Sequence, residues 1–150
     1  MIDIKFKKAF TMVELVFVII IIGILAAVAI PRLSATRDDA EITKARVVVA
    51  SVRNALAMER QKRILRGNFT KITAVGGTTG VFGNFDDNTS QPSVLEYPMA
   101  SSTTKGKWEY KSGTKEYVFH GLSDVAFIVD GNGKFVCVDD TTDACKTLTN

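Results

Sequence analysis

Apolar residues dominate the N-terminal part of the chain and follow one another without interruption. Leu15 to Ile30 contains no charged residue and no Asn, Gln, Ser or Thr. Together with its leading edge, the segment Phe10 to Ile30 has 21 residues. As a helix it would extend about 31 Å, close to the roughly 30 Å of a bilayer's hydrocarbon core. The pattern therefore predicts one membrane-spanning helix near the N-terminus.

A second hydrophobic pattern follows, with the spacing of an amphipathic helix. Its apolar positions recur at steps of three and four, at Ile42, Ala45, Val49, Val52 and Leu56. Gly67-Asn68 then forms a typical helix stop. We therefore expect a helix from Phe10 to about Arg66, whose second half buries the apolar stripe under a sheet.

The last third of the chain has the composition of strands and turns. Four runs are rich in aromatic and β-branched residues: Trp108–Lys111, Glu116–His120, Val125–Asp130 and Lys134–Val138. Asp130-Gly131-Asn132-Gly133 predicts a hairpin turn between the last two. Residues 67–106 are rich in Gly, Thr, Ser and Asn and predict a long loop, with short strands near Phe69 to Val75. The expected fold class is α+β, a long N-terminal helix packed against a small antiparallel sheet of three to four strands.

Charge is distributed unevenly behind a net value of +3. Residues 32–66 carry nine basic and four acidic side chains, whereas residues 67–150 carry seven basic and ten acidic ones. Lysines also precede the apolar run, at Lys5, Lys7 and Lys8. Because positive flanks tend to stay in the cytoplasm, we expect a cytoplasmic N-terminus and a translocated C-terminal domain. Arg32 and Arg37, on the far side of the run, weaken this argument.

Glu14 is the acidic residue at the leading edge of the apolar run. An ionised side chain at the centre of a bilayer costs about 2.5–3.5 kcal/mol even on lenient scales, so an acid at such a place suggests a function. A simpler interpretation is a capping box, with Thr11 as N-cap and Glu14 as its partner three residues later. The two interpretations are compatible.

A secretory signal peptide is an alternative for the whole segment, with Ala27-Val28-Ala29 as its small-residue cleavage site. Three features argue against it. The apolar core exceeds the usual 7 to 15 residues or so, Glu14 interrupts its start, and the helical pattern continues beyond the site. A plain single-span anchor is the other simple alternative.

The segment also carries a specific motif, Lys7-Lys8-Ala9-Phe10-Thr11-Met12-Val13-Glu14-Leu15, followed by the apolar run and Pro31. It resembles the N-terminus of type IV prepilins and of the pseudopilins of type II secretion and DNA-uptake machines. The resemblance implies cleavage between Ala9 and Phe10 by a prepilin peptidase, N-methylation of Phe10, and assembly into a helical filament. Such leaders usually end in Gly, where this chain has Ala9.

Cleavage after Ala9 would give Glu14 a partner. The new α-amine of Phe10 would lie one helical turn from the carboxylate, and Glu14 would then stand in the first turn, where the helix dipole favours an anion. The amine of a neighbouring subunit could serve equally. Pro31 predicts a kink or local melting around Ala27 to Pro31, or simply marks the membrane exit. We assign Glu14 and Pro31 to assembly.

The two cysteines, Cys137 and Cys145, form an even pair in a translocated domain and indicate a disulfide; the family resemblance likewise implies a C-terminal disulfide loop. Three acids lie inside that loop, at Asp139, Asp140 and Asp143. They could bind calcium, as in some pseudopilins, but they lack EF-hand spacing. We therefore expect an exposed acidic loop and no metal site.

Three further candidates have simple structural explanations. A basic cluster closes the long helix, at Arg60, Lys62, Arg63 and Arg66. It could touch nucleic acid, but basic residues also suit a last helical turn, so we expect no such partner. His120 is the only histidine, and we expect it at the surface of a strand end. Asn68 and Asn88 begin N-x-S/T acceptor patterns for glycosylation.

We thus expect four parts: a leader (1–9), a transmembrane and assembly helix (10–31), its amphipathic half (32–66) and a globular region (67–150). The first hypothesis is a structural pilin or pseudopilin of the inner membrane that polymerises in pilus biogenesis, type II secretion or DNA uptake. Its partners would be its own copies, minor pilins, a prepilin peptidase and an assembly platform. The alternative is a membrane-anchored periplasmic binding module. No catalytic constellation is present, so we expect no enzyme and no cofactor.

Overall fold

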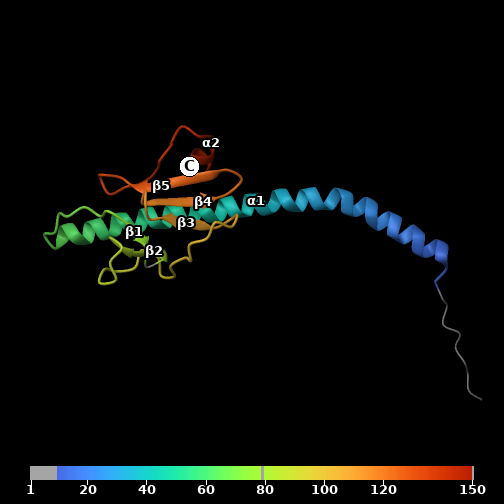
Figure 1. The fold of residues 1–150 in the computed structure, drawn as a ribbon, viewed down its shortest axis with the longest axis horizontal. Helices are drawn as coiled ribbons and strands as arrows, with labels where there is room; N and C mark the ends of the chain where they lie inside the picture. Colours follow the sequence, from blue (N-terminus) through green and yellow to red (C-terminus); the bar gives the residue numbers. More distant parts are fainter. Residues whose placement is uncertain (1–9, 79, 150) are drawn as a thin grey trace, which may run out of the picture. The chain divides into compact units, whose positions relative to one another are not determined.

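The computed structural model describes residues 10–78 and 80–149. The chain divides into two compact units, Met1–Arg37 and Asp38–Asn150, and we call the second unit the head. One long helix, α1 (Met12–Leu65), begins in the first unit and continues into the head, where the strands are found (Figure 1).

Helix α1 ends as the sequence predicts. Gly67 adopts a φ of +72°, and its N–H donates to the carbonyl of Ile64 at 2.9 Å. The N–H of Asn68 donates to the carbonyl of Arg63 at 2.8 Å. These two bonds form a Schellman motif, in which a left-handed glycine closes the last turn. The expected helix from Phe10 to about Arg66 is confirmed to within one turn at each end.

The main sheet is an antiparallel meander of four strands in the order β3-β4-β5-β6. Its strands are β3 (Trp108–Lys111), β4 (Glu116–His120), β5 (Asp124–Val129) and β6 (Phe135–Cys137). The predicted turn between β5 and β6 is present. There the Asp130 carboxylate accepts the N–H groups of Asn132 and Lys134, both at 2.8 Å, and these bonds lower the pKa of Asp130, with the Lys134 N–H contributing most. The α+β fold class is confirmed.

One face of this sheet meets the amphipathic stripe of α1. The stripe residues Ala45, Val49, Val52 and Leu56 are all buried, with Ile42 packed beside them. Opposite them lies an aromatic cluster, Phe82, Trp108, Tyr117, Phe127 and Phe135, whose neighbouring ring centroids are 5.0–5.8 Å apart. The head therefore has its own hydrophobic core, built from the second half of α1 and the sheets.

The prediction of a long loop over residues 67–106 has to be corrected. It contains a second, two-stranded antiparallel sheet, β1 (Val75–Gly77) and β2 (Gly80–Phe85), whereas Phe69 to Thr73 is not a strand. Gly76 explains the difference. Its φ is +92°, and a Cβ there would lie 2.2 Å from the backbone nitrogen of Gly83, so only glycine permits this close pairing.

The C-terminal tail is also more ordered than predicted. Cys137 and Cys145 form the expected disulfide, with Cα atoms 6.3 Å apart. Cys145 belongs to a short helix that was not predicted, α2 (Asp143–Thr149), whereas Asp139, Asp140 and Asp143 are exposed as expected. Two arginines of α1 hold this helix: Arg46 donates to the carbonyl of Thr147, and Arg53 donates to the carbonyl of Thr149 at 3.4 Å.

Candidate functional site

The N-terminal unit presents a long apolar helical surface. From Phe10 to Leu33, the large apolar side chains are between 40% (Ile21) and 83% (Met12) exposed. Within residues 10–78 and 80–149, α1 is the one helix long and apolar enough to cross a membrane. Because soluble proteins rarely expose so large a continuous apolar surface, this segment requires lipid or other protein chains around it.

At the start of α1, Thr11 is the N-cap. Its carbonyl accepts the N–H of Leu15 at 3.1 Å, and its hydroxyl accepts the N–H of Glu14 at 3.2 Å. Glu14 lies in the first turn, where the positive end of the helix dipole stabilises a carboxylate. The Thr11 half of the predicted capping box is therefore formed. Phe10 precedes the cap and is exposed, whereas Ala9 and the leader lysines lie outside the described residues.

Pro31 does not interrupt α1, which is helical from Met12 to Leu65. The predicted local melting around Ala27 to Pro31 is therefore wrong, whereas a kink there and a membrane exit at Pro31 stay predictions. A proline removes one helical hydrogen bond, and the good helix formers around it retain the others. The role of Pro31 in assembly stays a prediction.

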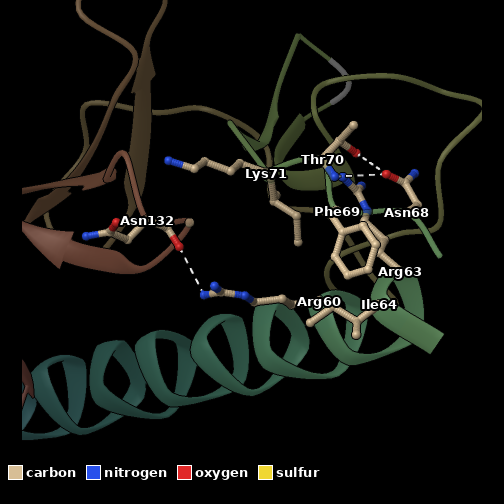
Figure 2. A pocket seen from close by; sticks show the side chains of 10 residues that line it. Arg60, Arg63, Ile64, Asn68, Phe69, Thr70, Lys71 and Asn132 are labelled. Carbon is tan, nitrogen blue, oxygen red and sulfur yellow. Dashed lines mark hydrogen bonds between the residues drawn. The ribbon is translucent and has the colours of Figure 1, made fainter. Parts of the chain in front are cut away.

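The basic cluster at the end of α1 is not one surface, because Arg60 and Arg63 have different partners; Figure 2 shows the bond from Arg60 to Asn132. Arg63 is buried and donates to Glu59 at 3.2 Å and to Asp86 at 2.7 Å. Burial alone would lower the pKa of Arg63, but these two partners raise it. Arg60, by contrast, is exposed and donates to the backbone carbonyl of Asn132 at 3.1 Å. Arg63 thus ties α1 to the end of β2, a structural role that the sequence pattern did not reveal.

His120 lies at the end of β4, as expected, but its side chain is only 13% exposed. Its Nε2 is 3.1 Å from a carboxylate oxygen of Glu109, and its Nδ1 is 3.0 Å from one of Asp124. The imidazole therefore bridges three neighbouring strands rather than facing solvent. The strand-end position was predicted, but the two carboxylates on β3 and β5 could not be placed beside His120 without the strand register.

The acidic residues near the disulfide make local contacts. Asp139 accepts the N–H and the hydroxyl of Thr141, at 3.0 and 2.6 Å, and the hydroxyl bond is the larger cause of a lowered pKa for Asp139. Asp143 opens α2. Among the residues that the structure describes, no group of three or more His, Cys, Asp or Glu side chains could hold a metal ion.

Both potential glycosylation sites use their amide oxygen in a turn. Asn68 accepts the N–H of Thr70 at 2.9 Å, and Asn88 accepts the N–H of Ser90 at 2.9 Å. Both asparagines are exposed. Glycosylation at either site stays a prediction.

Comparison with known proteins bears on the same N-terminal segment. Residues 4–30 match the family model of the prokaryotic N-terminal methylation motif. A 51-residue stretch is 45% identical to the type IV narrow pilus major component PilA5 of Thermus thermophilus. Part of this chain is therefore similar to a type IV pilin. The aligned stretch covers 34% of this chain and 44% of that relative, so the chain spans less than half of the relative's length. No solved structure matches.

The resemblance inferred from the motif is therefore confirmed, and the helix and antiparallel sheets agree with a pilin fold. The relative is, by its name, a structural component of a pilus. The exposed apolar helix and the methylation motif fit membrane anchoring and a place in a pilus filament.

Proposed function

We propose that this pilin-like protein is a structural subunit that polymerises into a helical, type IV pilus-like filament after its leader is removed. The observation that carries the proposal is the exposed apolar surface from Phe10 to Leu33, in a segment that matches the methylation motif. Lipid and a bundle of identical helices are both acceptable surroundings for such a surface. The helix can therefore pass from one to the other without meeting water.

In this proposal the subunit waits in the inner membrane, with residues 1–9 in the cytoplasm and the head in the periplasm. A prepilin peptidase cuts between Ala9 and Phe10, the new amine of Phe10 is methylated, and an assembly platform moves the subunit into the filament. Copies of the chain and related minor pilins are its neighbours. Residues 10–31 act as span and assembly helix, with Pro31 inside them, residues 32–66 carry the head, and residues 67–150 form the globular part.

Glu14 is the residue on which assembly depends. An α-amine is protonated at neutral pH, so a free Phe10 amine, from the same subunit or a neighbour, can pair with the carboxylate. In an apolar bundle such a pair also fixes the axial register, as a polar residue does in a coiled coil. The cleavage step creates the partner and thus controls when the pair can form.

Two experiments test the proposal. Mass spectrometry of the protein from its native cells should find an N-terminus at a methylated Phe10; an N-terminus at Met1 or after Ala29 would contradict it. Glu14→Gln should lower the amount of sedimentable polymer about tenfold or more, because a buried amine is left without its partner. Asp39→Asn removes an exposed acid of the same helix and should assemble normally. A binding module would retain its function in both variants.

A further inference from the structure

An open apolar hollow lies at the end of the head where β4 turns into β5. Its volume is about 240 Å³. It is lined mainly by apolar residues from α1, the β4–β5 turn, β5 and α2: Ile42, Gly121, Leu122, Val125, Ala144 and Leu148. Leu122 is 71% exposed. Since a cavity of roughly 150 Å³ can hold benzene, the hollow has room for an aromatic ring.

The edge of this hollow is acidic. Asp143 lines it directly and is fully exposed, with Lys146 at 3.8 Å as its partner. Asp124 lies between two of its lining residues and keeps 62% of its side chain exposed while it contacts His120 at 3.0 Å. An apolar centre with carboxylates at its edge favours an apolar group flanked by cations.

The opposite end of the head presents such a group. Phe69 follows the end of α1 and is 78% exposed, and Figure 2 shows its ring close to the side chains of Arg60 and Ile64. Arg60, Lys71 and Phe69 line one small hollow of about 100 Å³. Leu65, just before the loop, is 88% exposed. We call Arg60, Ile64, Leu65, Phe69 and Lys71 the distal patch.

The two surfaces cannot meet within one chain. Both belong to the same compact unit, and Ile42 and Ile64, which lie beside one surface and the other, are 22 residues apart on α1, about 33 Å along the helix. Two copies can bring them together. A contact between two different surfaces of identical chains does not close on itself as a two-fold contact does, so it can continue into an open helical polymer.

We propose that Phe69 of one copy inserts into the hollow beside Leu122 of a second copy, with Arg60 and Lys71 facing Asp124 and Asp143 of that copy. The contact rests on the proposed function, because it joins heads within the filament. This chain carries both halves of the contact, an apolar hollow with acidic residues at its edge and an exposed aromatic ring with basic residues beside it. A second copy is therefore favoured over a nucleic acid. Nucleic acid would match the cations of the distal patch but has no need of the hollow.

Photo-crosslinking in the full-length protein tests the contact directly. A benzophenone side chain at position 69, in polymer collected from cells, should give a dimer whose cross-linked peptide contains residues 121–125 or 143–148 of another copy. The same probe at position 97 is the control, because Tyr97 is 79% exposed and belongs to neither surface. Cross-links from position 69 to any other part of the head would overturn the contact but not the filament.

Variants test the energetics. Phe69→Ala should weaken the contact about tenfold or more, as expected for a fully buried aromatic side chain, and should shift polymer formation to higher protein concentration. Tyr97→Ala should not. Lys71→Glu should also weaken the contact. Adding Asp143→Lys in a double variant should restore it. The difference between the single variant and the unmodified protein should be smaller at high salt, because salt screens the charges.

Three results would contradict the proposal. If the unmodified protein forms no polymer at all, the proposed function fails and the contact with it. If polymer forms equally well in Phe69→Ala and Lys71→Glu, the function stands and the contact is wrong. If these variants assemble normally but lose retention on DNA, the distal patch is a nucleic-acid surface. A cooperative thermal transition like that of the unmodified protein, followed by circular dichroism, confirms that each variant is folded.

Discussion

Tyr117 shows how one side chain can join parts of the head that the sequence keeps far apart. Its hydroxyl donates to the carbonyl of Gly76 at 2.6 Å and accepts the N–H of Val75 at 3.0 Å. The ring is buried between Phe82 and Tyr110. Burial raises the pKa of Tyr117 above its usual value near 10. One residue of the main sheet therefore holds the first strand of the small one.

This raised pKa predicts a loss of stability at high pH. The unfolded chain releases the Tyr117 proton near pH 10, whereas the folded head retains it, so the free energy of unfolding falls as the pH rises above about 10. Tyr117→Phe should be about 1–3 kcal/mol less stable at neutral pH and should show a shallower fall. Urea unfolding of the detergent-solubilised protein at several pH values, followed by fluorescence of Trp108, measures both. Parallel curves for the two proteins above pH 10 would exclude Tyr117 as the cause.

Arg63 allows a second prediction about a single side chain, with Arg60 as a matched control one helical turn away. Arg63→Ala leaves the Glu59 and Asp86 carboxylates without their shared cation, and breaking a buried pair in this way costs about 3–5 kcal/mol. Arg60→Ala removes one exposed bond to a backbone carbonyl and should cost less than about 1 kcal/mol. The same urea titration compares them. Equal losses would mean that Arg63 acts only as another surface charge.

Among the elements, those with a regular hydrophobic period could be predicted and those defined by backbone geometry could not. The stripe from Ile42 to Leu56 predicted the buried face of α1, and the aromatic runs predicted all four strands of the main sheet. The β1–β2 hairpin depends on the positive φ of Gly76 and on the hydroxyl of Tyr117. Glycine-rich segments are typical of loops, so sequence composition pointed the other way.

The contacts of the candidate site also divide into those that the sequence could predict and those that it could not. Thr11 and Glu14 are three residues apart, so their contact could be predicted from sequence. Arg63 and Asp86 are 23 residues apart, and their pairing depends on a hairpin that was not predicted. The same holds for the hollow beside Leu122, which is formed by residues of both helices and of the β4–β5 hairpin.

The disulfide links two elements, and its effect on stability can be predicted. It joins β6 to α2, and the loop it closes is short, so the chain-entropy model gives about 2–3 kcal/mol. Reduction should lower the urea midpoint accordingly. The double variant Cys137→Ser, Cys145→Ser should show the same lower midpoint with or without reductant. A midpoint that moves with reductant in the double variant would show that the reagent acts elsewhere.

For the whole molecule, the division into two units predicts that the head folds independently of the N-terminal unit. Every residue of the hydrophobic core lies between Ala45 and Leu148, whereas the large apolar residues from Phe10 to Leu33 are exposed. The free energy of folding of the head should therefore come from the head alone. The apolar half of α1 should determine where the protein resides and what it assembles with, and contribute little to the stability of the sheet.

A fragment that begins at Asp38 should accordingly be soluble without detergent, with a cooperative thermal transition close to that of the full-length chain in detergent. Circular dichroism and the fluorescence of Trp108 measure the transition, and sedimentation should find a monomer at micromolar concentration, because the helices that bundle in a filament are gone. Adding back residues 10–37 should make the protein dependent on detergent or lipid. A fragment that is unfolded or aggregated would show that the head needs the first half of α1 for its own core, and the proposed exchange of the helix between lipid and filament would then disturb the head as well.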